Sequence, residues 1–197
     1  MTCPHDHGNS NDRNFDLGNC NPVSRLFSRR GVVVALASTS MVCAEPPVAA
    51  AFAPAAEDQA FMRLALDEAR RGDYPFGAVI VRDDKVIARG RNLGKVHDDP
   101  TAHAEMTAIR RCLADHGSAT LRGSTLYATG EPCPMCMGAI MWCHVGRLVF
   151  AASIKQLATK INQIMVPCAD MAANAPFASI AIKAGVLADE AMKLFDT

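Results

Sequence analysis

The amino-acid sequence predicts an α/β fold, a three-layer α-β-α sandwich in a single domain. Helical and strand patterns alternate along residues 57–197, which is typical of a sheet with helices on both faces. Half of the 197 residues are hydrophobic, which excludes a disordered chain and suffices for one buried core. The 20 basic and 20 acidic residues cancel, so no broad basic field is available to hold a polyanion.

Hydrophobic spacing assigns the individual elements. In residues 57–71, apolar side chains recur at i, i+3, i+4 and i+7 from Met62, which indicates an amphipathic helix ending before Gly72. Residues 76–81 and 86–89 form two strands of a hairpin with a polar turn between them. Thr101 is expected to cap a helix that runs to about His116. The same criteria predict a strand at 124–129, a helix beginning near Pro134, a strand at 147–151, a weakly patterned segment at 153–176, a strand at 179–183 and a helix over 187–195.

The first 53 residues have the pattern of an export signal. Arg29 and Arg30 precede a mild apolar run at 31–37, and a small-residue stretch ends at Ala51-Phe52-Ala53. Adjacent arginines before weakly hydrophobic residues resemble a twin-arginine signal, and the run is too short to remain as a membrane anchor. We therefore expect a signal segment at 1–53, a mature domain at 54–197 and a periplasmic or secreted protein.

The alternative to export is a cytoplasmic protein with an N-terminal extension. Replacing both arginines with lysine distinguishes the two, because it traps an exported precursor inside the cell. The mature domain alone holds 16 basic and 16 acidic residues, so its charge balance is neutral in either case.

Two short motifs place metal-binding residues at predicted helix starts. His103-Ala104-Glu105 begins one helix, and Pro132-Cys133-Pro134-Met135-Cys136 begins another, about thirty residues downstream. Cysteines three residues apart at a helix start point the same way, so both sulfurs can meet one ion. One histidine and two cysteines leave the fourth position of a tetrahedral Zn²⁺ open for water, which favours a catalytic zinc over a structural one.

Glu105 is the candidate catalytic residue beside this zinc site. Zn²⁺ lowers the pKa of a bound water towards about 7, and a nearby carboxylate can accept its proton. The expected chemistry is attack of the metal-bound hydroxide on an amidine-like carbon, with release of ammonia. Two alternatives stay open at this point: a redox dithiol at Cys133 and Cys136, and a non-catalytic module that zinc stabilises.

The sequence resembles the cytidine deaminase-like superfamily, within it the guanine deaminase and tRNA adenosine deaminase branch. The signature of a His-x-Glu motif followed by Pro-Cys-x-x-Cys is known from zinc deaminases. The residues that carry the resemblance are Pro75-Phe76-Gly77-Ala78-Val79-Ile80-Val81, Asp99-Pro100-Thr101-Ala102-His103-Ala104-Glu105, Glu131-Pro132-Cys133-Pro134-Met135-Cys136-Met137-Gly138-Ala139-Ile140 and Gly185-Val186-Leu187-Ala188-Asp189-Glu190.

The resemblance implies a five-stranded mixed sheet, a homodimer and one Zn²⁺ per chain. It implies that His103, Cys133 and Cys136 are the zinc ligands and that Glu105 is the proton shuttle. It further implies that Asn92 hydrogen-bonds the base, that Phe76 stacks near it, and that the backbone N–H of Ala104 contacts it. Packing in the core is the alternative role for Phe76.

The expected substrate is a free nucleobase or nucleoside, with a guanine-like purine favoured. The alternatives are adenosine-to-inosine editing of tRNA and deamination of cytosine or cytidine. The neutral charge of the chain and its expected export both argue against a nucleic-acid partner, and so against the first alternative. Two differences from guanine deaminases leave the identity of the deaminated base undetermined. Guanine deaminases carry an acidic residue after the strand matched by 148–151, where this chain has none, and no aromatic residue follows Phe195.

Overall fold

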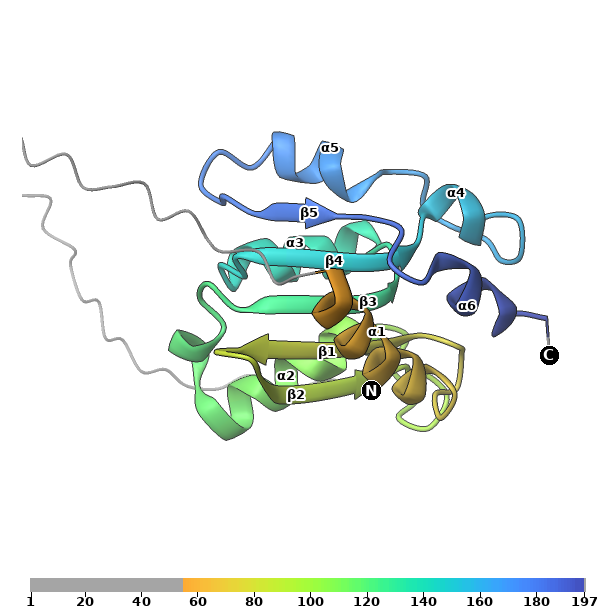
Figure 1. Ribbon diagram of the computed structural model, residues 1–197, viewed down its shortest axis with the longest axis horizontal. Coiled ribbons are helices and arrows are strands. Elements are labelled where there is room, and N and C mark those ends of the chain that lie inside the picture. The colour runs from red at the N-terminus through yellow and green to blue at the C-terminus, as the bar shows by residue number, and fades with distance from the viewer. Residues whose placement is uncertain (1–54, 197) are drawn as a thin grey trace, which may run out of the picture. The chain divides into compact units, whose positions relative to one another are not determined.

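The computed structural model describes residues 55–196 (Figure 1). The predicted signal segment at 1–53 lies outside these residues and stays a prediction. Within the described part of the chain, none of the helices has the length and apolar character needed to span a bilayer. Alternation of helices and strands is confirmed along the whole described range.

A five-stranded mixed sheet forms the middle layer, in the order β2-β1-β3-β4-β5 (Figure 1). β1 pairs with β2 and with β3 in antiparallel fashion, whereas β3–β4 and β4–β5 are parallel pairs. The strands are β1 (Gly77–Arg82), β2 (Lys85–Arg91), β3 (Thr125–Gly130), β4 (Arg147–Ala152) and β5 (Ala181–Lys183). The parallel β3 and β4 therefore end at the same edge of the sheet.

Helices cover both faces of the sheet, which confirms the predicted sandwich (Figure 1). They are α1 (Ala55–Ala69), α2 (Ala104–His116), α3 (Pro134–Trp142), α4 (Ile154–Leu157), α5 (Cys168–Ala173) and α6 (Ala188–Lys193), with a 3-10 turn, η1, at Ser118–Thr120. One buried cluster joins α1 and α6 to the sheet through residues such as Met62, Val79 and Ala191. A second cluster joins α2, α3 and α5 to the other face through residues such as Ile109 and Met137.

The expected hairpin between β1 and β2 is confirmed and turns on two residues. Asp83 and Asp84 have φ values of 49° and 58°, and the flanking Arg82 and Lys85 are paired. Two successive positive φ values define the tight turn whose twist matches that of antiparallel strands. Aspartate tolerates this conformation better than most residues, which explains why it occupies both positions.

α2 lies unusually close to β2, and Gly90 makes this possible. A Cβ atom on Gly90 would lie 2.1 Å from the carbonyl oxygen of Ala104 and 2.5 Å from the amide nitrogen of Ala108. Both are backbone atoms, so neither can rotate away, and only glycine permits the observed contact. Since Ala104 is the first residue of α2, this contact sets where that helix begins relative to the sheet.

A buried ion network joins α1 to β3, β4 and β5, on the face of the sheet that α2 does not cover. The carboxylate of Asp58, which has no exposed surface, accepts hydrogen bonds from Arg147 at 2.7 and 2.8 Å, Lys183 at 2.7 Å and the hydroxyl of Tyr127 at 2.9 Å. Burial by itself raises the pKa of Asp58, but these donors outweigh burial and lower it to about 2. The periodicity of the sequence assigns Asp58 only to a helix and does not reveal this network.

One local expectation is wrong, namely that Thr101 caps the helix that begins the His103 motif. α2 begins at Ala104 with His103 as its N-cap residue. Thr101 is instead hydrogen-bonded to Asp99. The Asp99 carboxylate accepts from the backbone N–H and from the hydroxyl of Thr101, at 2.8 and 2.6 Å. These bonds close a local turn before the helix starts, and the hydroxyl oxygen of Thr101 accepts a hydrogen bond from the Arg110 side chain at 3.1 Å instead of one from the backbone of the first helical turn.

Replacing Gly90 with alanine is expected to destabilise the fold by about 1–3 kcal/mol, because α2 must move to accommodate the new Cβ. Urea unfolding of the purified protein measures this. The matched control is Gly138→Ala in α3, where an added Cβ meets no atom within 4 Å. The control should be neutral or stabilising by about 0.5–1 kcal/mol. Equal stability of the two variants would contradict the constraint assigned to Gly90.

Replacing Asp58 with asparagine is expected to cost about 3–5 kcal/mol at pH 7, because Arg147 and Lys183 then face a neutral amide in place of the Asp58 carboxylate. The pKa of Asp58 falls from 3.8 to about 2 on folding, so its contribution is complete above about pH 4. That contribution, roughly 2 kcal/mol, is lost as the pH falls from about 4 to 2. Urea unfolding at pH 7 and pH 3 should therefore show the gap between wild type and variant narrowing in acid. The exposed Asp83→Asn serves as the control.

Candidate metal centre and active-site cavity

The predicted metal ligands lie at the starts of two helices. His103 is the N-cap residue of α2 and Cys133 is the N-cap residue of α3, both with extended backbone. Cys136 lies three residues after Cys133 in the first turn of α3. An N-cap residue and the third residue of its helix lie on the same side of the helix start, as in a capping box. Local backbone geometry thus directs both sulfurs towards one point.

The three ligand atoms fit a zinc ion. The Nδ1 atom of His103 lies 3.6 Å from the Sγ atom of Cys133 and 3.6 Å from that of Cys136. All three atoms lie within 4.8 Å of one another. Zinc bonds of about 2.0 Å to nitrogen and about 2.3 Å to sulfur in a tetrahedron separate the two atoms by about 3.5 Å. The observed separations therefore match what a tetrahedral zinc site requires, and a redox dithiol has no need of the histidine.

The cluster is electrostatically coupled. A hydrogen bond from the Cys136 thiol, followed in importance by one from His103, lowers the pKa of Cys133 to about 4. The same contact with Cys133, together with burial, raises the pKa of Cys136. Contact with Cys133 also raises the pKa of His103. Deprotonation of Cys136 beside the Cys133 thiolate therefore needs a nearby cation, and a zinc ion would supply that positive charge.

Glu105 lies on the first turn of α2 and opens on the same cavity as His103 and Cys133. Its side chain is buried, with 7% of the residue exposed, and burial raises the pKa of its carboxyl group. A buried carboxyl group with a raised pKa can both accept and return a proton near neutral pH. The structure thus places Glu105 where the sequence predicts a proton shuttle.

The cavity has a volume of about 700 Å³, and most of the expected substrate contacts line it. Phe76 and Asn92 both lie on its wall. The side-chain oxygen of Asn92 accepts a hydrogen bond from the N–H of Gly94 at 3.1 Å, so its amide NH₂ group remains as the donor for a substrate. Ala104 is almost fully buried, with its carbonyl against Gly90, and its expected contact with a base stays a prediction.

Phe76 lies between the cavity and the core, and its stacking on a base stays a prediction. It lines the cavity and it also packs edge to face on Phe195, with ring centroids 5.4 Å apart. Gly130 makes room for this ring, because a Cβ there would lie 2.9 Å from Phe76 and 3.0 Å from Leu157. The aromatic residue near the C-terminus thus supports the wall of the cavity from behind.

Several residues of the cavity are absent from the sequence-based expectations. Residues 161–164, which belong to the weakly patterned segment, line one side of the cavity. Tyr74 and Lys95 lie on another side, with the ammonium group of Lys95 4.7 Å from the centre of the Tyr74 ring. Glu131, next to the cysteine motif, lines it as well. No periodicity marks these residues, because they lie on irregular loops that only the fold brings to the site.

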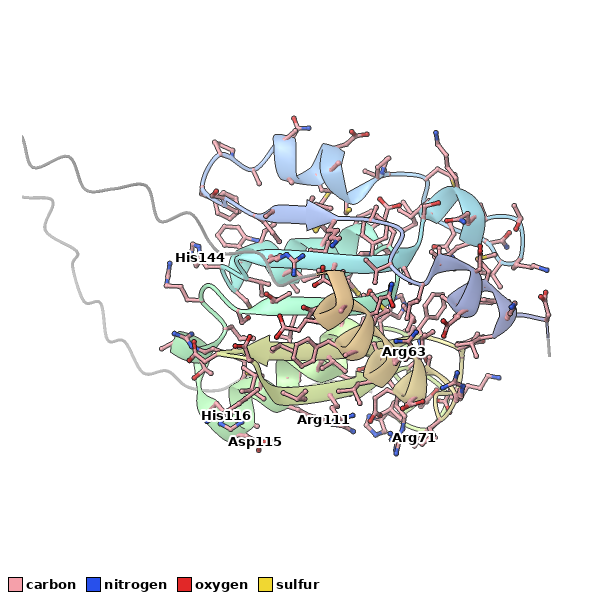
Figure 2. The ribbon with its side chains drawn as sticks, viewed as in Figure 1. Arg63, Arg71, Arg111, Asp115, His116 and His144 are labelled. Atoms are coloured by element: carbon pink, nitrogen blue, oxygen red, sulfur yellow. The ribbon has the colours of Figure 1, made fainter. Side chains whose placement is uncertain are left out.

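The remaining cysteines and histidines of the described range lie elsewhere. Cys112 and Cys168 are buried in the apolar cluster under α2 and α3, and Cys143 packs against the same cluster. His144 lies just before the start of β4 (Figure 2), whereas the cavity-lining Glu131 and Cys133 follow the end of β3, which runs parallel to β4. These positions confirm that the core, rather than the metal centre, accounts for Cys112 and Cys143.

The mixed sheet between helices and the His-Cys-Cys set at two helix starts define a zinc-binding deaminase domain. Residues 55–152 match the family described as "Cytidine and deoxycytidylate deaminase zinc-binding region". A tRNA-specific adenosine deaminase of Buchnera aphidicola is 37% identical over 147 residues, covering 71% of this chain and 86% of that protein. The chain therefore belongs to the cytidine and deoxycytidylate deaminase family.

Relatives with two different substrates are similar to this chain. The guanine deaminase of Bacillus subtilis is 50% identical over 78 residues, covering 40% of this chain. The match spans only half the length of that enzyme. A solved structure from a study of A-to-I editing by tRNA:A34 deaminases is 33% identical, covers 68% of this chain and 98% of its own, and has a TM-score of 0.59.

Proposed function

We propose that the domain is a zinc-dependent hydrolase that deaminates a free nucleobase or nucleoside, with a guanine-like purine as the favoured substrate. The observation that carries the proposal is the position of Glu105. Its buried carboxyl group opens on the same cavity as the ligand cluster of His103, Cys133 and Cys136. A zinc ion that served stability alone would need neither an open cavity nor a buried carboxyl group beside it.

The reaction adds water to a ring carbon that carries an amino group and then breaks the C–N bond. His103, Cys133 and Cys136 would hold a zinc ion, which would supply a Lewis acid that lowers the pKa of water to about 7. Glu105 would pass the first proton of the attacking water to the ring nitrogen, and then carry the second proton, from the added hydroxyl group, to the amino group, which leaves as ammonia. The ring carbon ends as a carbonyl, and the carboxyl group of Glu105 is restored for the next cycle.

Two residues would hold the base in place. The amide NH₂ of Asn92 can donate to a ring nitrogen or a carbonyl oxygen of the substrate, and Asn92 is only 5% exposed, which strengthens this bond. Phe76 offers an aromatic face to the base, and the ring of Phe195 supports it from behind. Positioning of this kind contributes to the rate by aligning the amino carbon with the ligand cluster.

The charges around the cavity support a small neutral substrate. Among the described residues that line it, Lys95 is the only lysine or arginine, whereas Asp98, Glu105 and Glu131 are acidic. A phosphate backbone needs several cations close to the site. The second candidate function is deamination of adenosine in tRNA. The extensive coverage of the tRNA-specific relative and the tRNA:A34 deaminase structure favours this second function.

Replacing Glu105 with glutamine is expected to lower turnover by about 10²–10⁴-fold, because the amide cannot accept and return the proton. Zinc content should stay at one ion per chain, since the three ligands remain. Elemental analysis and an ammonia assay on the purified protein measure the two quantities. The matched control is Glu190→Gln on α6, a residue with a 43% exposed side chain, which should leave both unchanged. Undiminished turnover in Glu105→Gln would contradict the role assigned to this residue.

An ammonia-release panel is expected to identify a purine base or its nucleoside as the best substrate. The panel contains guanine, adenine, cytosine, their nucleosides and an RNA hairpin with an adenosine in its loop. Faster deamination of the hairpin than of every small molecule would overturn the substrate proposal in favour of tRNA. If the zinc-loaded protein releases ammonia from none of these compounds, the deaminase proposal itself fails.

A further inference from the structure

Glu131 joins the end of β3 to a segment far along the chain. Its backbone N–H donates to the carbonyl of Ala152 at 2.7 Å, which extends the parallel pairing of β3 and β4 by one residue. Its two carboxylate oxygens accept separate hydrogen bonds. One comes from the N–H of Ile154 at 2.8 Å, and the other comes from the N–H of Cys168 at 2.9 Å. A single side chain therefore binds the backbone at two places 14 residues apart.

The segment between these two places is buried at its ends and exposed in its middle. Ile154, Leu157 and Cys168 are 1–2% exposed, whereas Ile164 and Met165 are 62% and 56% exposed. Most of the hydrogen bonds within the segment close local turns, and an ion pair on the surface joins Lys160 to Asp196. A compact loop with close ends takes its position from how those ends are held.

The middle of this segment forms one wall of the cavity. Residues 161–164 line the same cavity as the metal ligands His103 and Cys133 and as Asn92, and Glu131 itself lies on the cavity wall. The placement of this wall thus depends on the two hydrogen bonds that Glu131 accepts. We propose that Glu131 is a positioning residue, which clamps both ends of the segment 154–168 and so holds the substrate-facing wall in place. This inference rests on the proposed function of the cavity.

A carboxylate suits this role better than any neutral side chain of the same size. Each of its two oxygens accepts one N–H, and both bonds gain strength from the negative charge. Glutamine has the same shape but only one acceptor oxygen, so its NH₂ group would face the second N–H donor. Glu131→Gln should therefore release one end of the segment while leaving the packing of Ile154 and Leu157 intact.

The effect on catalysis follows from what the wall touches. It contacts the substrate away from the ligand cluster and Glu105, so it binds the substrate and the transition state to a similar extent. Loss of such uniform binding raises KM and changes kcat little. We expect Glu131→Gln to raise KM by about tenfold with less than a threefold change in kcat, the size that one charge-assisted hydrogen bond would give.

The experiment compares wild type, Glu131→Gln and two control variants as zinc-loaded full-length proteins. Amide hydrogen exchange of 154–168 is expected to become about tenfold faster in Glu131→Gln, with one zinc per chain retained. Asp73→Ala is the control for exchange, because it removes the one carboxylate oxygen that accepts hydrogen bonds from the backbone N–H groups of Lys95 and Val96, in a different part of the fold. Its exchange should change at 95–96 and not at 154–168. Asp83→Asn, on the β1–β2 turn, is the control for KM and kcat.

Three outcomes would overturn the proposal. Unchanged exchange in 154–168 would show that Glu131 does not hold the segment. A fall in kcat with constant KM would assign Glu131 to the chemical step, and loss of zinc would assign it to the metal centre. If wild type itself releases no ammonia from any base, the proposed function fails, while the exchange result still decides whether the clamp exists.

Discussion

The site depends on the meeting of two helix starts at one point beside the sheet. His103 precedes α2 and Cys133 precedes α3, and their ligand atoms can share an ion only if both helices begin at the correct depth. β3 leads directly into α3, so the position of the cysteines follows from that strand. The histidine has no such direct connection, and it depends on the contact between the backbone of α2 and Gly90. Absence of a Cβ at one residue of β2 therefore permits the closeness on which the metal centre relies.

The two buried carboxyl groups, one on each face of the sheet, have pKa values shifted in opposite directions. Asp58 is surrounded by Arg147, Lys183 and Tyr127, and these donors lower its pKa although burial opposes them. Burial is the dominant influence on Glu105, and its pKa rises. The first arrangement keeps a fixed charge that ties α1 to the strands. The second keeps a group that can exchange a proton, which is the property that hydrolysis of a C–N bond requires.

Particular residues show which features the sequence predicts well. The alternation of patterns predicts the sandwich, because the 3.6-residue and two-residue periods reflect burial on one face of each element. The ligands and Glu105 are predicted because local helical geometry brings the two cysteines together and because the His-x-Glu motif followed by Pro-Cys-x-x-Cys resembles that of zinc deaminases. Thr101 is not the helix cap because α2 begins only at Ala104, and because the hydroxyl oxygen of Thr101 accepts a hydrogen bond from the Arg110 side chain. The hydrogen bonds of Glu131 and Asp58 are not predicted, because their partners lie between 23 and 125 positions away in the sequence.

The sequence by itself determined the class of fold, the donor set for zinc and the carboxyl group beside it. These features depend on periodicity and on spacings within single helix starts, which operate over a few residues. Only the tertiary structure decided which loops enclose the cavity, how Phe195 supports Phe76, and which side chain holds the segment 154–168. Those contacts join residues far apart in the chain through irregular backbone, where no repeating pattern connects a residue with its neighbours in space. The cavity wall at residues 161–164 is built from such contacts.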